Sequence, residues 1–274
     1  MPELPEVETI VRDLAPELTG RRILRARLSH DDVLRGTTRR KLTARLANST
    51  IDAITRRAKH AVLHLGTRRL VIQPGMTGAL LVQHEPLSAE DRKYAVLRAW
   101  LDDGRVLVYH DVRRLGTLLL LDEKSWQSYD TALGPEPLDP DLDVDALVEG
   151  MRRSRQAVKK VLMDQRVVVG VGNIYANEAL FAARIDPSRA ASKLTENETR
   201  TLIAETQRIL RNAIASRGST IRDYRTGTGE AGGFQLSHLV YGRGDEPCAN
   251  CGTRLTETHL IDGRTTVLCH RCQR

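Results

Sequence analysis

The spacing of apolar residues changes character along this chain of 274 residues, and it begins with a helical pattern. In residues 5–18, Val7, Ile10 and Leu14 recur at the spacing of one helix face. Glycine is a frequent helix terminator, so we predict a helix over this range that ends near Gly20.

From about residue 22 to residue 121 the helical spacing gives way to short runs of apolar and β-branched residues. The clearest runs are 61–65, 70–72, 79–82, 94–101, 105–109 and 117–121. Glycines separate them, and Asp103-Gly104 is a typical hairpin turn. Strands at short spacing without intervening helices predict an antiparallel β-sandwich or barrel.

Residues 134–143 are rich in proline and acidic residues, as is typical of a boundary between domains. Beyond them the helical period returns, and we predict helices near 144–163, 173–183 and 195–216. The third would begin with a capping box formed by Thr195 and Glu198. Residues 217–233 are rich in glycine, threonine and charge, which predicts a mobile loop.

The four cysteines lie within the last 27 residues, as two Cys-x2-Cys pairs that are 17 residues apart. Cys248, Cys251, Cys269 and Cys272 therefore match a tetrahedral zinc site on a β-hairpin. Two disulfides are the alternative, which a reducing compartment would disfavour. Four thiolates leave no open coordination position, so we expect one structural zinc ion per chain.

The charge balance indicates a polyanionic partner. The chain has 42 basic and 35 acidic residues, a formal charge of +7 and a pI near 9.5. Aromatic residues make up 4% of the chain, too few for the stacking platforms of single-strand binders, so a duplex partner fits better. Arginine and lysine clusters at several places along the chain would supply contacts along its backbone, although any one of them alone is more simply a solvated surface charge.

Residues 167–175 resemble a strand entering a Gly-x-Gly-x-x-Gly nucleotide loop, but Tyr175 occupies the third glycine position. A helix–turn–helix fits better: Gly170 and Gly172 bend the chain and Asn173 starts the next helix. Amide groups at that helix start could hold a DNA phosphate.

The composition also bears on location. The first residues are acidic and proline-rich, unlike a secretory signal, and the sequence has no run approaching the ~18 apolar residues of a membrane span. We therefore expect a cytoplasmic protein without membrane association.

The start of the chain carries candidate chemistry. Removal of Met1 would expose Pro2, whose ring nitrogen would be a free secondary amine. On the order of a tenth of an α-amino group is neutral at pH 7, and a neutral amine can attack a sugar carbon to form an iminium. The positive end of the predicted helix would favour the unprotonated amine, whereas Glu3 and Glu6 there could serve only to compensate the helix dipole.

Eight motifs, in order along nearly the whole chain, resemble those of bacterial formamidopyrimidine-DNA glycosylases, which are 8-oxoguanine DNA glycosylase/AP lyases. They are Pro2-Glu3-Leu4-Pro5-Glu6-Val7-Glu8-Thr9, Arg57-Ala58-Lys59, Gly75-Met76-Thr77-Gly78, Arg113-Arg114-Leu115-Gly116, Leu133-Gly134-Pro135-Glu136-Pro137-Leu138, Val171-Gly172-Asn173-Ile174-Tyr175-Ala176, Val240-Tyr241-Gly242-Arg243 and the four-cysteine finger.

The resemblance implies a fold of the α+β class with several domains. These would be an N-terminal β-sandwich with its helix at 1–133, a linker at 134–146, a helical helix–two-turn–helix domain with a lesion-capping loop at 147–235, and a zinc finger at 236–274. It also implies excision of oxidised purines from damaged double-stranded DNA, followed by β,δ-elimination. A clamp on one lesion needs only a monomer.

Residue roles follow from the same resemblance. Pro2 would be the nucleophile and Glu3 the catalytic acid, with Glu6 a second acid of the site. Lys59, Arg264 and Asn173 would hold the phosphates around the lesion, with Lys159 close by. Met76, Arg113 and Leu115 would fill the space left by the flipped base, beside the DNA-contacting Arg114.

The chain also departs from the family pattern. Gln73-Pro74 replaces the usual His-Leu, Leu115 replaces an aromatic residue, and Arg217-Gly218 replaces Gly-Gly. Because leucine stacks less well than phenylalanine, we expect weaker discrimination against the wrong opposite base. An endonuclease VIII-like enzyme for oxidised pyrimidines and a non-catalytic zinc-finger DNA-binding protein remain alternatives. The intact Pro-Glu-Leu-Pro-Glu start and the capping-loop segment disfavour the first. The joint presence of Pro2, Glu3 and Lys59 disfavours the second, because duplex binding alone needs no free N-terminal proline.

Overall fold

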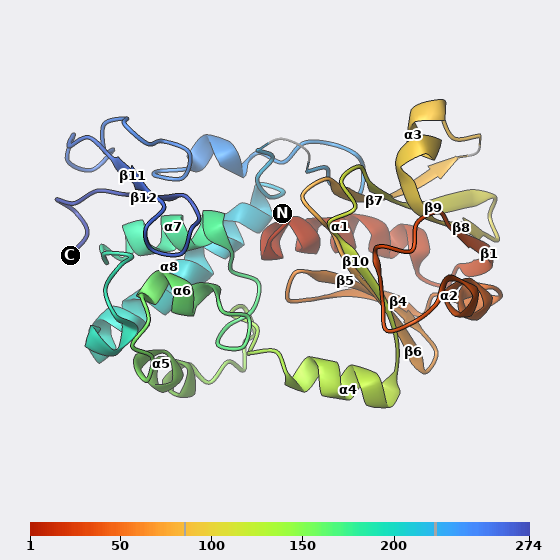
Figure 1. The fold of residues 1–274 in the computed structure, drawn as a ribbon, viewed down its shortest axis with the longest axis horizontal. Helices are drawn as coiled ribbons and strands as arrows, with labels where there is room; N and C mark the ends of the chain where they lie inside the picture. Colours follow the sequence, from red (N-terminus) through yellow and green to blue (C-terminus); the bar gives the residue numbers. More distant parts are fainter. Residues whose placement is uncertain (85, 222–223) are drawn as a thin grey trace. The chain divides into compact units, whose positions relative to one another are not determined.

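The computed structural model describes residues 1–84, 86–221 and 224–274 (Figure 1). The chain forms two compact units, and each is described by itself. The first comprises Met1–Thr131 and Ser216–Gly233, and the second comprises Ala132–Ala215 and Phe234–Arg274. The loop predicted at 217–233 thus belongs, in its described part, to the unit of the N-terminal half of the chain; Arg222 and Asp223 lie outside the described residues.

The first unit is a β-sandwich of two five-stranded sheets. One sheet has the order β3-β1-β8-β9-β7 and the other the order β2-β10-β6-β5-β4. The strands are β1 Arg22–Leu28, β2 Leu34–Arg35, β3 Ser49–Thr50, β4 Ala53–Arg57, β5 His60–Leu65, β6 Arg68–Gln73, β7 Gly78–His84, β8 Ala95–Leu101, β9 Arg105–Asp111 and β10 Thr117–Asp122. The predicted sandwich is confirmed, although the short pair β2–β10 is parallel.

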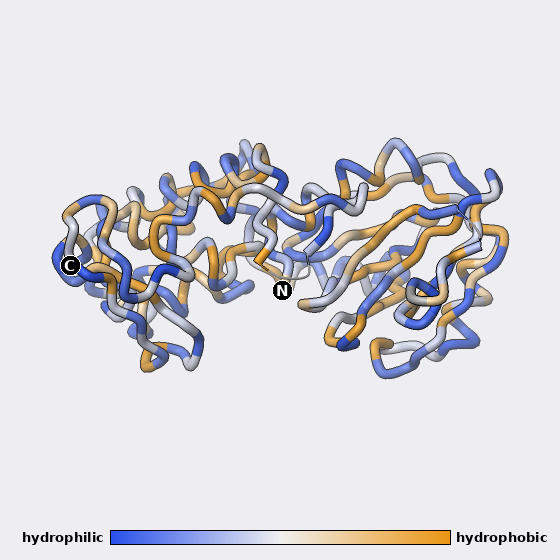
Figure 2. Tube along the Cα trace, turned by 90° about the horizontal axis from the view of Figure 1, so that it is seen from above, coloured by the Kyte–Doolittle hydropathy of each residue, from blue (hydrophilic) through white to orange (hydrophobic). Residues whose placement is uncertain are grey.

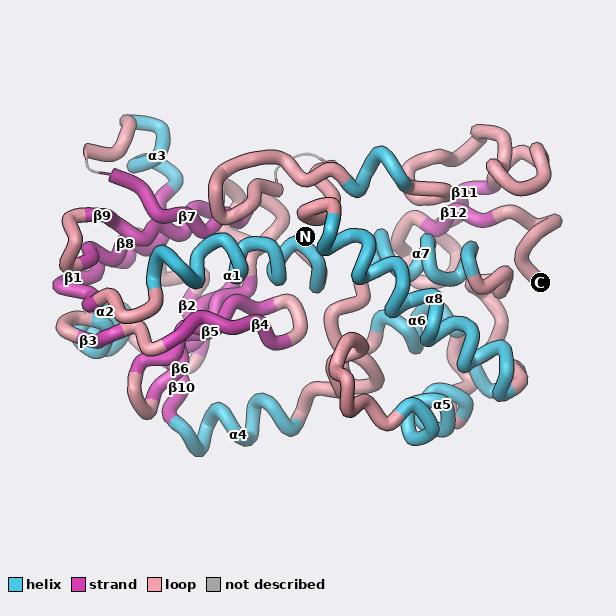
Figure 3. The backbone as a smooth tube through the Cα atoms, turned by 180° about the vertical axis from the view of Figure 1, so that it is seen from behind, coloured by secondary structure: helices cyan, strands magenta, loops and turns pink. Residues whose placement is uncertain are grey.

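Helix α1 (Leu4–Leu18) packs beside β4 and β5 (Figures 1 and 3). Its face of Val7, Ile10 and Leu14 is almost completely buried and joins one hydrophobic cluster with residues of both sheets. Apolar area removed from water is the main favourable contribution to packing of this kind. The predicted helix is confirmed, and Gly20 follows its end with φ of +81°.

Three helices of the first unit were not predicted: α2 (Arg39–Leu46), α3 (Ala89–Tyr94) and α4 (Glu123–Thr131). Helix α2 buries only Leu42 and Leu46 and is capped by the Thr38 hydroxyl, which accepts from the Lys41 amide at 3.3 Å. A stripe of two leucines in an arginine-rich segment is too narrow to give a clear helical period.

The second unit is helical, with α5 (Val144–Arg152), α6 (Val158–Met163), α7 (Asn173–Ala182) and α8 (Glu196–Ala215). Short 3-10 turns lie at Ala191–Lys193 and Phe234–Ser237, and a hairpin of β11 (Thr256–Thr258) and β12 (Thr266–Leu268) follows. Figure 2 shows hydrophobic and hydrophilic positions interleaved along the trace. Helices α5 and α8 each bury an apolar face, whereas α7 is buried at every position from Ile174 to Phe181. The C-terminal hairpin is confirmed, and so is the capping box of α8, in which the Thr195 amide donates to Glu198 at 2.7 Å.

The single helix predicted near 144–163 is wrong, because the chain leaves the helix between α5 and α6. There Ala157 bridges Ala190, and the Ala191 amide donates to the Gln156 carbonyl at 2.9 Å. The backbone groups of this segment therefore bond to a distant stretch of chain instead of continuing the helix.

The predicted linker lies within the second unit and packs tightly against its other residues. The Gly134 amide donates to the Gln165 carbonyl at 2.8 Å, and a Cβ at Gly134 would lie 2.8 Å from the backbone of Val167. The Gln207 side chain donates to the Pro137 carbonyl at 2.8 Å. A glycine is required at this close approach, and the segment is held in place.

Candidate functional site

The N-terminal turn buries three candidate residues at the start of α1. Pro2 is buried, Glu3 is 4% exposed and Glu6 is 2% exposed. Glu3 is the N-cap of α1, and its amide donates to Glu6 Oε2 at 2.8 Å. The amine that removal of Met1 would create therefore lies immediately before the positive end of a helix, with two carboxylates in the same turn.

Glu6 also links this turn to the 216–233 segment. Its Oε1 accepts a hydrogen bond from the Ser219 amide at 2.7 Å, and a Cβ at Gly218 would lie 2.9 Å from that oxygen. Gly218 has φ of +79°, so glycine suits the position on both counts. The Tyr224 hydroxyl lies 3.2 Å from the Glu6 carbonyl, and burial and the Glu6 charge raise the pKa of that phenol. Glu6 thus serves a structural purpose whatever its chemical one.

A second attachment holds the same segment on α1. Asp13 Oδ2 accepts from the Arg217 guanidinium at 2.9 Å and from the Gly227 amide at 3.0 Å. The 216–233 segment is thus hydrogen-bonded to the helix that begins behind Pro2. These contacts place the described part of the predicted lesion loop beside the candidate nucleophile's helix.

Lys59 lies in the two-residue loop between β4 and β5, where Arg57 pairs with His60. Ala58 takes a positive φ of +55° to close this tight hairpin, and Lys59 is 7% exposed. His60 lies 3.2 Å from the Tyr129 hydroxyl of α4, and burial lowers its pKa, with a smaller contribution from the neighbouring Lys59 charge. The histidine beside Lys59 is therefore favoured in its neutral form.

Two turns of the first unit expose the residues expected to enter the duplex. Met76 lies in the turn Gly75–Gly78 (the first turn) and is 39% exposed. Arg113, Arg114 and Leu115 lie in the turn Arg113–Gly116 (the second turn), where Leu115 is 54% exposed. Arg114 has φ of +50° and its guanidinium lies 2.6 Å from Asp32. Met76 and Leu115 are exposed to solvent and do not contribute to the core. Core packing, the main alternative role for Met76, is therefore excluded.

The second unit holds the other predicted phosphate contacts. Asn173 begins α7 and its side-chain amide donates to the Thr265 carbonyl at 2.9 Å, in the hairpin loop that also carries the exposed Arg264. Lys159 is fully buried, and its Nζ donates to Thr266 Oγ1 at 2.7 Å and lies 3.6 Å from Asp262. Through these contacts with Thr266 and Asp262, the buried Lys159 ammonium stabilises the loop that carries Arg264.

Sequence reasoning missed the buried polar residues that hold these loops. Glu178 of α7 accepts from the amides of Leu239, Val240 and Tyr241 at 2.8–3.0 Å. Asn177 accepts from the Val267 amide at 2.8 Å, and Asp111 lies between the first and second turns. The sequence signal that could have identified them is a polar residue within an otherwise apolar helix or strand.

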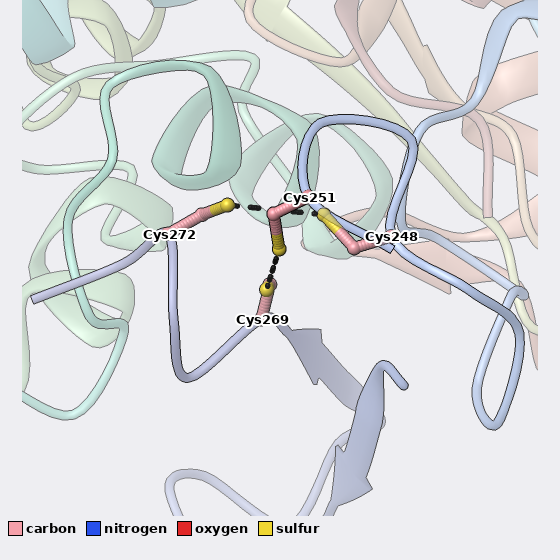
Figure 4. A group of neighbouring side chains, drawn as sticks. All are labelled: Cys248, Cys251, Cys269 and Cys272. Carbon is pink, nitrogen blue, oxygen red and sulfur yellow. Dashed lines mark hydrogen bonds between the residues drawn. The ribbon is translucent and has the colours of Figure 1, made fainter. Parts of the chain in front are cut away.

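The four cysteine sulfurs converge at the base of the hairpin (Figure 4). All four Sγ atoms lie within 4.8 Å of one another, with 3.9 Å between Cys248 and Cys272 and 3.5 Å between Cys251 and Cys269. Zn–S bonds of about 2.3 Å in a tetrahedron place sulfurs roughly 3.8 Å apart. The donor set and its spacing thus fit zinc, and among the described residues these cysteines are the group that could hold a metal ion.

Among the described residues, none of the helices is both long and apolar enough to cross a membrane.

Comparison with known proteins identifies the family. Residues 1–118 match the formamidopyrimidine-DNA glycosylase N-terminal domain, and residues 133–225 match the formamidopyrimidine-DNA glycosylase H2TH domain. The chain is 44% identical to a formamidopyrimidine-DNA glycosylase of Stutzerimonas stutzeri, with all of both chains covered. It is 42% identical to the enzyme of the same name from Thermomicrobium roseum, covering 100% of this chain and 99% of the relative.

Solved structures agree. A Lactococcus lactis FPG mutant in complex with a Fapy-dG-containing DNA superimposes with a TM-score of 0.92 at 32% identity, with both chains fully covered. The MutM (FPG) protein of Thermus thermophilus gives a TM-score of 0.87 at 37% identity, covering 99% of this chain and 98% of the other. With two family models spanning most of its length and full-length relatives above 40% identity, the chain belongs to the formamidopyrimidine-DNA glycosylase family.

Proposed function

We propose that this chain removes oxidised purines, 8-oxoguanine and formamidopyrimidines, from duplex DNA and then cuts the strand, with the Pro2 amine as nucleophile. The observation that carries the proposal is the burial of Pro2, Glu3 and Glu6 in one turn at the positive end of α1. Binding to a duplex alone would need neither a free N-terminal proline nor carboxylates buried beside it.

In the proposed reaction, removal of Met1 gives Pro2 a secondary amine, which the adjoining helix end favours in its neutral form. The nitrogen attacks C1′ of the damaged nucleotide, the N–C1′ bond forms and the bond to the base breaks. The C1′–O4′ bond then breaks as the ring oxygen takes a proton, which leaves an iminium between the Pro2 nitrogen and C1′. The iminium withdraws electrons and acidifies the C2′ proton, so successive β- and δ-elimination breaks the two flanking C–O bonds. Glu3 transfers the protons for opening of the sugar.

The base must leave the helical stack before Pro2 can reach C1′. We assign the filling of the resulting space to Met76, Arg113 and Leu115, the void-filling residues, whose exposure on two turns of one unit supports the role. Arg113 would contact the orphaned cytosine.

Phosphate contacts would come from both units. Lys59 of the first unit and Asn173 and Arg264 of the second are assigned to the backbone around the lesion, and Lys159 to the support of the Arg264 loop. A zinc ion held by Cys248, Cys251, Cys269 and Cys272 would have no open coordination position, so it would stabilise the hairpin and take no part in the reaction.

An oxidised pyrimidine is a second candidate substrate. A Lactococcus lactis FPG that is 31% identical to this chain has been solved with an oxidised-pyrimidine-containing DNA, at a TM-score of 0.91. We rank it second because the Pro-Glu-Leu-Pro-Glu start and, apart from Arg217, the 216–233 segment resemble those of the purine enzymes.

Borohydride trapping tests the proposal. The purified protein, with loss of Met1 verified by mass, is mixed with a duplex that carries 8-oxoguanine opposite cytosine. We expect a covalent adduct that is absent on undamaged duplex and absent for Pro2→Gly, while Pro2→Gly still binds the damaged duplex. An adduct that survives Pro2→Gly would contradict the assignment of the nucleophile. Trapping on an oxidised-pyrimidine duplex but not on 8-oxoguanine would favour the second candidate.

A further inference from the structure

A buried carboxylate lies between the two turns that carry the void-filling residues. Asp111, at the end of β9, is 1% exposed. Its Oδ2 accepts hydrogen bonds from the Gly116 amide at 2.7 Å and from the Tyr109 hydroxyl at 3.0 Å, and its Oδ1 accepts from the Thr77 hydroxyl at 2.6 Å. A buried carboxylate is costly unless it is well hydrogen-bonded, and these three donors offset that cost.

Thr77 connects the first turn to the second. Its hydroxyl donates to Asp111 and also accepts from the Arg113 amide at 2.9 Å. The Thr77 oxygen therefore holds the beginning of the second turn directly, and through Asp111 it holds the end of that turn at Gly116. The Arg114 amide adds a bond to the Asp111 carbonyl at 3.2 Å.

The backbones of the two turns also touch. A Cβ at Gly75 would lie 2.6 Å from the Gly116 nitrogen. A Cβ at Gly116 would lie 1.9 Å from the Tyr109 hydroxyl and 2.5 Å from the Gln73 carbonyl. No side chain fits between the turns at these points, so neither turn can move far without the other.

We propose that Asp111 and Thr77 are positioning residues that hold the two turns as one unit. The inference rests on the proposed function, in which Met76 on one turn and Arg113 and Leu115 on the other enter the duplex together. Loss of the coupling should impair insertion and contact with the opposite base, and should leave the chemistry at Pro2 unchanged. A purely structural role for Asp111 predicts no such separation.

The Thr77 hydroxyl allows the sharper test, because Thr77 is only partly buried and its replacement leaves no buried charge without partners. Thr77→Val keeps the shape of the side chain and removes both hydrogen bonds, and Thr77→Ser keeps the hydroxyl as the matched control. Asp111→Asn is a second variant that retains the size of the carboxylate. Thermal unfolding of each identifies any general loss of stability.

Hydrogen exchange in the DNA-free protein tests the coupling without reference to activity. The readout is the Gly116 amide, which keeps its own acceptor, Asp111, in Thr77→Val. Thr77→Val loses the hydrogen bond from residue 77 to the Asp111 carboxylate, and this loss should speed exchange of the Gly116 amide about tenfold. In Thr77→Ser the Gly116 amide should exchange at the wild-type rate. Unchanged exchange in Thr77→Val would overturn the coupling.

Activity tests the consequence. Excision of 8-oxoguanine from duplex DNA by Thr77→Val should slow about tenfold, and its preference for cytosine over adenine as the opposite base should fall. Strand cutting at a preformed abasic site in single-stranded DNA should not change, because no void has to be filled there. Equal losses on all three substrates, or an unchanged preference, would overturn the positioning role. A wild-type protein inactive on every substrate would instead refute the proposed function, and hydrogen exchange would still decide the coupling.

Discussion

Glu6 illustrates how one side chain can serve the fold and the candidate site together. Its two oxygens accept the amides of Glu3 and Ser219, so the carboxylate fixes the turn that follows Pro2 and attaches the 216–233 segment to it. From the sequence alone, compensation of the helix dipole explained Glu6 equally well. The contact with Ser219, 213 residues away, is the feature that no local pattern could predict.

Leu115 is the residue at which we expect this chain to differ most from its relatives. A leucine side chain offers no aromatic face for stacking on the neighbouring bases, so it should hold the void less firmly than phenylalanine. We predict that Leu115→Phe raises the ratio of 8-oxoguanine excision opposite cytosine to that opposite adenine by about three- to tenfold, the value of a fraction of one stacking contact. Single-turnover rates on the two duplexes measure it. An equal ratio in both proteins would show that the residue does not discriminate.

Arg264 is predicted to contact a phosphate. Removing one phosphate contact should weaken binding to many sequences alike and reduce the slope of log affinity against log salt by about one unit. Fluorescence anisotropy of Arg264→Ala on several damaged duplexes, at a series of salt concentrations, measures this slope. If the slope stays at the wild-type value, Arg264 faces solvent in the complex.

At the scale of elements, the start of α8 combines a capping box with an ion pair. Glu198 accepts from the Thr195 amide at 2.7 Å and from the Arg189 guanidinium at 2.7 Å. The Arg189 hydrogen bond is the main cause that lowers the pKa of Glu198 from 4.5 to about 2. A carboxyl group with a lowered folded-state pKa adds stability above its unfolded value and loses it as the pH falls toward the folded value.

We therefore predict that Glu198→Gln lowers the free energy of unfolding by about 1 kcal/mol at pH 7, a modest value because the pair is partly exposed. The gap between wild type and variant should narrow as the pH falls below 4.5 and close toward pH 2. Thermal unfolding of both proteins from pH 7 down to pH 3 measures this gap. Glu205→Gln is the control, because it removes a surface ion pair with Arg208 on the same helix. A gap that widened on acidification would contradict the sign.

Elements with a strong local signal were predictable from the sequence, and elements fixed by distant partners were not. Local patterns in the sequence predicted the apolar face of α1, the strands from β5 to β10 and the capping box at Thr195. The break between α5 and α6 depends on the pairing of Ala157 with Ala190, and α2 buries only two leucines. Tertiary partners decide such segments, and a window of sequence does not contain them.

At the scale of the whole molecule, the candidate chemistry is divided between two units. Pro2, Glu3 and Lys59 belong to the first, whereas Asn173 and Arg264 belong to the second. Spacing along the sequence cannot bring residues of the two units to one phosphate, so their common role came from the resemblance to a family. The structure shows which contacts within each unit hold these residues in place, such as the hydrogen bond from Lys159 to Thr266 next to the Arg264 loop.

The C-terminal hairpin is the part of the molecule that we expect to depend on metal. Its strands have three residues each, and the apolar cluster that it forms with Phe181 of α7 counts two of the cysteines, Cys248 and Cys269, among its buried members. So small a core cannot stabilise a fold without a further constraint, which bound zinc would supply.

Removal of the metal should therefore unfold the hairpin and weaken DNA binding while the β-sandwich keeps its structure. The hairpin positions Arg264 and the Thr265 carbonyl that accepts from the Asn173 side chain. When the hairpin loses its order, the affinity for DNA should therefore fall. We would strip zinc with a chelator, verify its absence by elemental analysis, and compare hydrogen exchange in residues 246–274 with that in residues 1–84. Faster exchange in the hairpin alone, restored by zinc and accompanied by weaker binding, is the expected result. A metal-free protein that keeps both its hairpin protection and its affinity would show that the cysteine cluster stabilises this unit without zinc.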